Sequence, residues 1–181
     1  FLGKENKYSN NFFVFVHDFN RDQWNDILVI GFPGQDTSWF ENPKGKAGHW
    51  LRHTVFDQTD NESPTFADLT GDGRPEQVCI TKGQYGYAEP DWSDPAKPWR
   101  FHAISPNNKY GNFTHGMGLG DINGDGRVDV LQAAGWWEQP AAGDHKGPWP
   151  YHPIAFGRWG ESPGEEIVVG RDASSRALEV V

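Results

Sequence analysis

The feature that most constrains the fold of this chain is an internal repeat of about fifty residues. Three stretches align: HDFNRDQWNDILVIG at 17–31, ADLTGDGRPEQVCIT at 67–81 and GDINGDGRVDVLQAA at 120–134. Their leading acids, Asp18, Asp68 and Asp121, lie 50 and 53 residues apart. Two further motifs recur in the same phase, an aromatic residue followed by Glu and Pro (SWFENP, GYAEP, GWWEQP) and Trp-x-x-His (WLRH, WRFH, WPYH). Motifs that repeat in phase predict three copies of one structural unit.

Each unit contains four short runs of β-forming residues separated by Gly, Pro, Asn and Asp, and no run has a helical apolar period long enough for a helix. In the first unit the runs are FFVFV, DILVI, TSWFE and WLRHTVF. Four strands in a repeat of this length are typical of a β-propeller blade. The sequence therefore predicts an all-β fold, a β-propeller of four-stranded antiparallel blades.

The predicted blades cover approximately residues 11–57, 61–105 and 113–156, with a partial blade at 161–181. About three and a half blades cannot close a ring, because the end blades would leave apolar faces and open strand edges. We therefore expect the chain to form one portion of a seven-bladed ring. The remaining blades, or other domains of a larger chain, would be its structural partners.

The three aligned loops carry oxygen-bearing side chains at positions 1, 3, 5 and 9, counted from the leading acid. Alternate oxygen donors, with a backbone carbonyl at position 7, can wrap a hard cation such as Ca²⁺. Gly73 and Gly126 at position 6 permit the positive φ of a tight wrap, whereas the first loop has Arg21 and Gln23 in place of both glycines. The predicted metal ligands are Asp18, Asn20, Asp22 and Asp26 in the first loop, Asp68, Thr70, Asp72 and Glu76 in the second, and Asp121, Asn123, Asp125 and Asp129 in the third.

An alternative is that these loops are solvated acidic turns that bind no metal. Nine of the 25 acidic residues lie in the loops, however, and carboxylates at this density repel one another unless a cation neutralises them. We therefore predict two or three bound Ca²⁺ ions, with the first loop the weakest site because Arg21 adds positive charge. The loops are not EF-hands, since strands flank them and position 12 holds Val29, Cys79 or Gln132 instead of a bidentate Glu.

The composition limits which partners the protein can bind and which cysteine chemistry it can use. A formal net charge of −9 without a basic stripe argues against nucleic acid, and no apolar run approaches the length of a membrane span. The single cysteine, Cys79, lies within the apolar run QVCI and is predicted to be a buried, inert thiol. A disulfide framework and a thiolate metal site are therefore excluded.

The pattern DxNGDGxxD, set between two strands at blade spacing, resembles the FG-GAP or VCBS repeats of integrin-type and bacterial extracellular propellers over residues 11–170. This resemblance implies a propeller fold, calcium in the loops, and a secreted, periplasmic or cell-surface location. It does not specify a ligand. The SWFENP and Trp-x-x-His motifs also resemble the propeller domain of fungal aldos-2-ulose dehydratase, a metal-dependent sugar dehydratase.

The histidine of the recurring Trp-x-x-His motif invites a catalytic interpretation. A residue that repeats at the same place in every unit is nevertheless more often architectural than catalytic. We therefore predict that His53, His102 and His152 pack and form hydrogen bonds in the outer part of each blade.

A ligand site is expected at the rim opposite the calcium loops, because rim loops carry most ligand contacts on such scaffolds. If the first strand of each blade leads into the acidic loop, its start lies at that rim, where the aligned residues are Phe12, Glu62 and His115. Glu62 and His115 are candidates for a catalytic pair, since a His beside a carboxylate can act as a general base or hold a second metal. The loop residues predicted to contact ligand are Asn61, Gln84, Tyr85 and Tyr110.

His17 is a third catalytic candidate. The other two units have Ala67 and Gly120 at its position, which therefore favours a small residue. Each of the three candidates, His17, Glu62 and His115, could instead make only structural hydrogen bonds.

The sequence is compatible with three functions of different classes. The first is an extracellular, calcium-stabilised propeller that binds carbohydrate or protein at its rim without catalysis. The second is a metal-dependent sugar lyase or dehydratase that uses the channel-mouth His and Glu residues, with a transition metal such as Zn²⁺ as its cofactor. A third is a purely structural module. Imidazoles within about 2.1 Å of a metal with an open coordination position would favour the enzyme.

Overall fold

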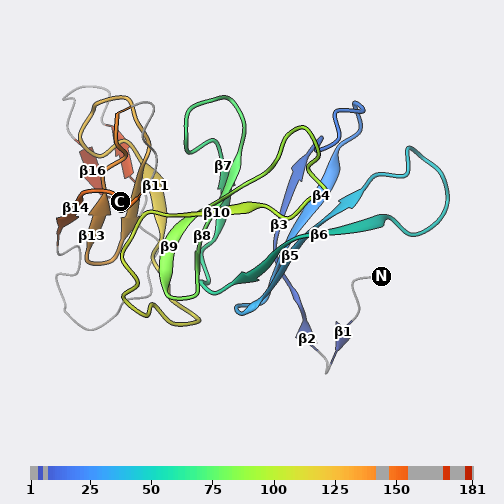
Figure 1. Ribbon diagram of the computed structural model, residues 1–181, viewed down its shortest axis with the longest axis horizontal. Helices are drawn as coiled ribbons and strands as arrows, with labels where there is room; N and C mark the ends of the chain where they lie inside the picture. The colour runs from blue at the N-terminus through green and yellow to red at the C-terminus, as the bar shows by residue number, and fades with distance from the viewer. Residues whose placement is uncertain (1–3, 6–7, 142–146, 155–168, 172–177, 181) are drawn as a thin grey trace.

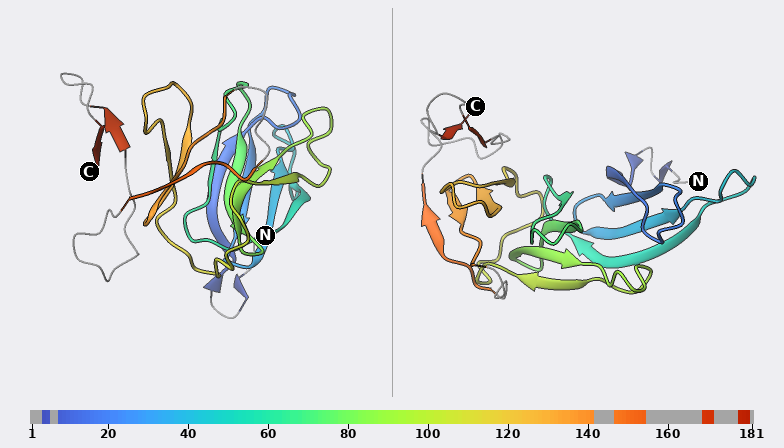
Figure 2. Two further views of the ribbon diagram at one scale, coloured as in Figure 1. Left: turned by 60° about the vertical axis from the view of Figure 1, so that its left-hand side comes forward. Right: turned by 90° about the horizontal axis from the view of Figure 1, so that it is seen from above.

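The computed structural model describes residues 4–5, 8–141, 147–154, 169–171 and 178–180. The strands in this part of the chain form three four-stranded and two two-stranded antiparallel sheets. In each large sheet the strands pair in chain order, so each sheet is a meander. Figure 1 and the turned views of Figure 2 show the three large sheets side by side along the long axis of the molecule. The predicted all-β architecture of four-stranded blades is confirmed, whereas the size of the complete ring stays a prediction.

The strands of the three large sheets follow one another along the chain. The first blade consists of β3 (Asn11–His17), β4 (Asp26–Gly31), β5 (Gln35–Glu41) and β6 (Leu51–Thr59). The second consists of β7 (Thr65–Ala67), β8 (Glu76–Thr81), β9 (Gln84–Glu89) and β10 (Arg100–Ala103). The third consists of β11 (Gly118–Gly120), β12 (Asp129–Gln132), β13 (Gly135–Trp137) and β14 (Tyr151–Pro153). The short pairs are β1 (Lys4–Glu5) with β2 (Tyr8–Ser9), and β15 (Val169–Arg171) with β16 (Leu178–Val180).

The predicted partial blade at 161–181 falls mostly outside the described residues. Within them it contributes only the β15–β16 pair.

The two interfaces between consecutive blades are built in the same way. One apolar cluster joins the first and second blades, and another joins the second and third. A backbone hydrogen bond accompanies each cluster: the NH of Trp99 donates to the carbonyl of Val55 at 2.7 Å, and that of Trp149 donates to Ile104 at 2.8 Å. Both donors are the tryptophan of a Trp-x-x-His motif, so this residue marks where each blade joins the preceding one.

The first blade also has a face that packs against no other blade in the described part of the chain, and this face is exposed. Val14 and Val16 on β3 are 56% and 62% exposed. In the third blade the residues at the same two positions, Met117 and Leu119, pack in the cluster shared with the second blade. Phe66, which corresponds to Val16 in the second blade, packs against the first blade. The first blade thus presents to solvent the surface that the other two blades use for packing.

The third and fourth strands of each blade share an aromatic residue, a glutamate and a histidine. In the first blade the His53 ring stacks on Trp39 with centroids 4.2 Å apart, and its Nε2 lies 3.2 Å from Glu41 Oε2. The corresponding residues are Tyr87, Glu89 and His102 in the second blade and Trp136, Glu138 and His152 in the third. The prediction that these histidines are structural parts of the outer blade is confirmed.

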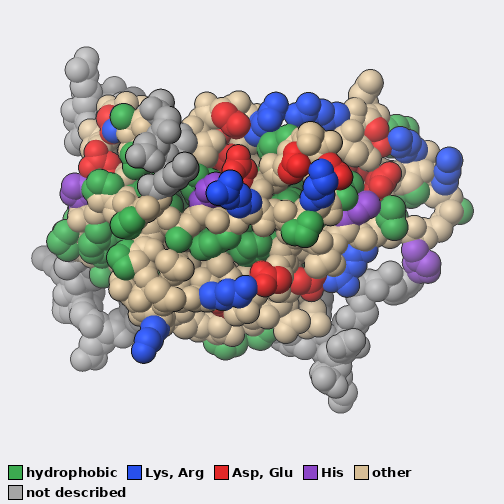
Figure 3. All heavy atoms as spheres, in the orientation of Figure 1, with side chains coloured by type: hydrophobic (Ala, Val, Ile, Leu, Met, Phe, Trp, Pro, Cys, Tyr) green, Lys and Arg blue, Asp and Glu red, His purple; other side chains and the backbone are tan. Residues whose placement is uncertain are grey.

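Two features of the described residues bear on membranes and on charge. Among the described residues, no helix is long and apolar enough to cross a membrane. On the face shown in Figure 3, acidic and basic side chains are interspersed and form no continuous basic stripe.

Candidate functional site

The three acidic loops lie at the same end of their blades, each between the first and second strands. The leading aspartate of each loop accepts hydrogen bonds from backbone NH groups further along it. In the second loop the Asp68 carboxylate accepts from Gly71 N at 2.8 Å and from Gly73 N at 2.9 Å. Asp18 and Asp121 accept corresponding bonds within their own loops. The loops therefore wrap around their first carboxylate.

The backbone conformation of the wrap is common to all three loops. Positions 4 and 6 have positive φ in each, and in the first loop Arg21 and Gln23 adopt φ values of 57° and 72° where the other loops have glycine. At position 3, the side-chain carbonyls of Asn20 and Asn123 each accept a hydrogen bond from the NH at position 5, at 3.1 Å. The first loop thus adopts the glycine-type wrap without its glycines, at the cost of backbone strain.

The acid at position 9 is the first residue of the second strand, and it is buried in every loop. Asp26, Glu76 and Asp129 are 0%, 2% and 0% exposed. Each accepts a hydrogen bond from the NH at position 2 of its own loop, at 3.0, 2.9 and 2.9 Å respectively. Burial raises the pKa of Glu76 to about 7 and also raises the pKa of Asp26 and of Asp129. Position 9 therefore closes the loop in addition to being a predicted metal ligand.

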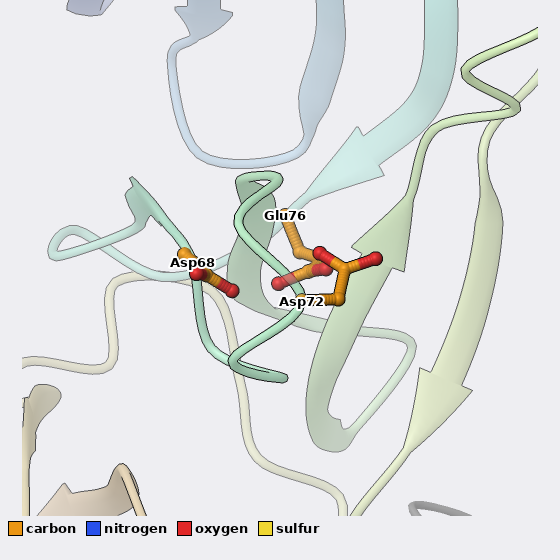
Figure 4. Close-up of side chains that lie close together, drawn as sticks. All are labelled: Asp68, Asp72 and Glu76. Carbon is orange, nitrogen blue, oxygen red and sulfur yellow. The ribbon is translucent and has the colours of Figure 1, made fainter.

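The second loop has the arrangement best suited to a cation. Asp68, Asp72 and Glu76 each offer a carboxylate oxygen, and these oxygens lie within 4.8 Å of one another (Figure 4). Oxygens that bind one Ca²⁺ at roughly 2.3–2.6 Å can be at most about 5 Å apart, so the residues fit this ion. A cation here would also offset the cost of ionising the buried Glu76. Thr70, the fourth predicted ligand, donates its hydroxyl to Glu76 Oε1 at 3.0 Å.

In the first and third loops a basic side chain lies against the acid at position 5. Lys44 Nζ is 2.8 Å from Asp22 Oδ2, and the Arg127 guanidinium pairs with Asp125. Among the described residues, a three-acid group with metal-ligand spacing occurs only in the second loop. The sequence indicated Arg21 as the competing charge in the first loop, but Lys44 is the one that pairs with its acid, and Lys44 lies outside the loop pattern.

At the opposite rim, Glu62 and His115 lie side by side. Each stands three residues before the first strand of its blade, so the two occupy the same place in consecutive blades. His115 Nε2 is 2.9 Å from Glu62 Oε2, and the side chains are 45% and 24% exposed. The structure thus brings together two of the three predicted catalytic residues in a solvent-accessible pair.

His17 lies apart from this pair. It is the last residue of β3, at the acidic-loop end of the blade, whereas Glu62 precedes the start of β7. Its ring makes edge contacts with Phe19, Phe66 and Trp92 at centroid distances of 5.2, 5.9 and 5.2 Å. Burial lowers the pKa of His17. Its position is that of a packing residue between the first two blades.

Two of the four predicted ligand contacts lie inside the protein. Asn61 is 0% exposed: its Oδ1 accepts from Ile80 N at 2.8 Å and its Nδ2 lies 3.7 Å from Met117 Sδ. Tyr85 is also 0% exposed, and its ring packs against Tyr110 and the third blade. Neither side chain reaches the surface, so the prediction that they contact ligand is corrected.

The other two predicted contacts are partly buried. Gln84 Nε2 donates to the carbonyl of Ser105 at 3.1 Å. The Tyr110 hydroxyl accepts a hydrogen bond from Asn108 Nδ2 at 3.1 Å. Both make internal hydrogen bonds that a ligand would have to share.

An aromatic group lies near the Glu62–His115 pair, and the sequence predicted only one of its members, Phe12, at this rim. This rim aromatic group consists of Phe12, Phe32 and Phe113, with centroid distances of 5.7 Å between Phe12 and Phe32 and 5.5 Å between Phe32 and Phe113. Phe113 is 46% exposed. Phe12 aligns with Glu62 and His115, and Phe113 precedes His115 by two residues. No such pattern indicates Phe32, which comes from the hairpin between β4 and β5.

Comparison with known proteins agrees with this geometry. The blades and their wrapped acidic loops define a repeat protein of the propeller class. Residues 18–79 match the family model described as an FG-GAP-like repeat, a span that runs from the first acidic loop into the second strand of the second blade. Residues 18–79 of the chain therefore carry an FG-GAP-type repeat, and the four-stranded sheets are consistent with a propeller fold. Neither the curated proteins nor the solved structures returned a match, so the resemblance to the dehydratase propeller stays a prediction.

Proposed function

We propose that this protein is a calcium-stabilised β-propeller module that binds a carbohydrate or protein ligand at the rim opposite its acidic loops. The observation that carries the calcium part is the convergence of Asp68, Asp72 and Glu76 within 4.8 Å. Three carboxylates so close together repel one another unless a cation neutralises them. The second loop is the strongest site of the two or three, because basic side chains already pair with acids in the other two loops.

A location outside the cytoplasm follows from the same proposal. Calcium modules that work in secreted proteins or at the cell surface bind the ion with modest affinity, which suits the high calcium level found there. FG-GAP repeats are also typical of extracellular propellers. We therefore propose a secreted, periplasmic or cell-surface protein.

Calcium titration of chelator-treated protein by calorimetry tests the metal sites. The Asp72→Asn variant should lose the second-loop site, because the amide keeps the hydrogen bond from Arg74 N but not the charge. Asp57→Asn is the matched control, since Asp57 is an exposed aspartate outside the loops. The proposal fails if the wild-type protein binds no calcium, or if Asp57→Asn lowers the stoichiometry as much as Asp72→Asn does.

The rim part of the proposal rests on the exposed Glu62–His115 pair. Its imidazole and carboxylate side chains are 45% and 24% exposed, at the end of the blades opposite the acidic loops. Rim residues of this kind contribute most ligand contacts on repeat scaffolds. Screening the calcium-loaded protein against glycans and extracellular proteins, with Glu62→Gln as the variant, measures this part separately from the metal sites.

A second candidate is the metal-dependent sugar lyase, favoured by the 2.9 Å contact between His115 and Glu62. A carboxylate so placed orients an imidazole that removes a proton from a sugar carbon. Catalytic zinc sites use three protein ligands, however, and no third His, Cys, Asp or Glu completes such a group with this pair among the described residues. Stoichiometric zinc and sugar elimination that are both lost in His115→Ala would replace the binding function with this one.

A further inference from the structure

Three consecutive blades meet at one built junction on the rim. Residues 111–116, which lead into the third blade, cross the connection between the first and second blades. The NH of Phe113 donates to the carbonyl of Asp60 at 2.9 Å, and the NH of Glu62 donates to the carbonyl of Thr114 at 3.0 Å. Two reciprocal backbone bonds hold the crossing segments in register. Side chains on this junction are therefore carried by fixed backbone and not by a free loop.

Phe113 is held there in an unfavourable conformation. Its φ is 68°, a value that glycine adopts without cost and that a bulky residue adopts rarely. Strained residues of this kind persist where the surrounding structure fixes them, and they cluster at ligand contacts. The ring is also not buried in the core: it is 46% exposed and contacts Phe32 at an interplanar angle of 65°. The junction thus presents an aromatic ring to solvent in spite of the strain.

Polar groups that can form hydrogen bonds lie on the two crossing segments of this junction. The Glu62 carboxylate and the His115 imidazole lie 2.9 Å apart and are both accessible. Asn112 is exposed, and its amide nitrogen lies 2.9 Å from the point where a side chain on Gly34 would begin. Gly34 therefore leaves the room that lets this amide lie over the turn of the first blade. The junction therefore carries an exposed aromatic ring together with a carboxylate, an imidazole and an amide.

We infer that the rim aromatic group and the Glu62–His115 pair form a subsite for one neutral pyranose ring of a glycan, an inference that rests on the proposed binding function of the rim. The apolar C–H face of the sugar stacks on Phe113, while its hydroxyls pair with Glu62, His115 and the Asn112 amide. The Glu62 carboxylate and the formal net charge of −9 both repel anionic glycans. A neutral sugar therefore fits the site better than an acidic one.

The test is calorimetric titration of the calcium-loaded protein with neutral gluco-, galacto- and manno-oligosaccharides, and with an anionic glycan for comparison. Phe113→Gly removes the ring and accepts the positive φ, so the variant should fold, which thermal unfolding checks. Phe113→Trp keeps an aromatic face at the same position. Leu51→Ala, which truncates a side chain that is 60% exposed on the outer strand of the first blade, is the control.

The expected result is a neutral oligosaccharide whose affinity falls by about tenfold or more in Phe113→Gly, while Phe113→Trp and Leu51→Ala retain it. Glycan binding that Phe113→Gly leaves unchanged would overturn the subsite but not the binding function. Binding of only anionic glycans, or of only a protein, would overturn the ligand class and likewise leave the binding function intact. Absence of any ligand in the wider glycan and protein screen would overturn both.

Discussion

The imidazole of His102 lies nearly parallel to the ring of Tyr87, with centroids 4.8 Å apart and 11° between the planes. The two residues are direct partners across the β9–β10 ladder, and His102 Nε2 also lies 2.7 Å from Glu89 Oε2. The pairs Trp39–His53 and Trp136–His152 occupy the same register in the other blades. In each blade, the same stacking of a histidine on an aromatic ring thus links the fourth strand to the third.

Replacing His102 with alanine should therefore act on stability. The substitution removes a stacked ring and a hydrogen bond to a carboxylate, and we expect the free energy of unfolding to fall by about 1–2 kcal/mol. Urea unfolding followed by tryptophan fluorescence measures this change. Calcium stoichiometry and rim binding should be unaltered. A variant of wild-type stability that had lost ligand binding would instead make the histidine a functional residue.

The acids at positions 9 and 5 of a loop should respond differently to calcium. Asp129 accepts from Ile122 N and Gln139 N, both at 2.9 Å, so Asp129→Ala leaves two NH groups without this partner. We expect a loss of about 2–4 kcal/mol in the free energy of unfolding with or without calcium. Asp125→Asn keeps the bond from Arg127 N but loses the ion pair with the Arg127 guanidinium, so we expect a loss of less than about 1 kcal/mol in chelator and a larger loss in calcium.

Thermal unfolding of both variants, in calcium and in chelator, separates the two roles. Equal behaviour of Asp125→Asn and Asp129→Ala in chelator would show that position 9 has no structural role beyond metal binding.

Much of the fold could be predicted because each structural position of the blade occurs three times in the sequence. Glycines, acids and the Trp-x-x-His motif recur at fixed offsets, and each recurrence limits the strand order and the place of the loops. The wrapped conformation of residues 18–26 was predictable for the same reason, even though Arg21 and Gln23 replace its glycines. The residues of the Glu62–His115 pair could be placed together because both precede an inner strand by three residues.

The rest depended on contacts between segments that no local pattern records. Asn61 and Tyr85 are polar or amphipathic residues near turns, yet both point inward, one to bond Ile80 and the other to pack on the third blade. Lys44 reaches the first loop from the following hairpin. Phe113 becomes part of a rim group only because its segment crosses residues 60–62. Chain crossings and inward rotations of this kind follow from three-dimensional packing.

The exposed face of the first blade gives a matched pair of substitutions. Val14 is 56% exposed, whereas Met117, at the same position of the third blade, is 4% exposed and packs against the second blade. We expect Met117→Ala to lower the free energy of unfolding by about 2 kcal/mol or more, and Val14→Ala to change it by less than about 0.5 kcal/mol.

Chemical denaturation of the two variants in parallel measures this difference. A large loss in Val14→Ala would mean that this face is covered in solution, for example by self-association, which sedimentation velocity at several protein concentrations would detect.

Cys79 provides a probe of the interface between the first two blades without any substitution. The thiol is fully buried in that interface, and burial raises its pKa to about 12. Burial thus keeps the thiol protonated, and no reagent can reach it in the closed blade. Labelling by a disulfide reagent should therefore follow opening of β8. If calcium binds the second loop as proposed, it should slow the labelling, because β8 begins at Glu76, a predicted ligand of that loop. Labelling that is fast in the native protein, or that calcium leaves unchanged, would mean that the loop and the interface open independently of each other.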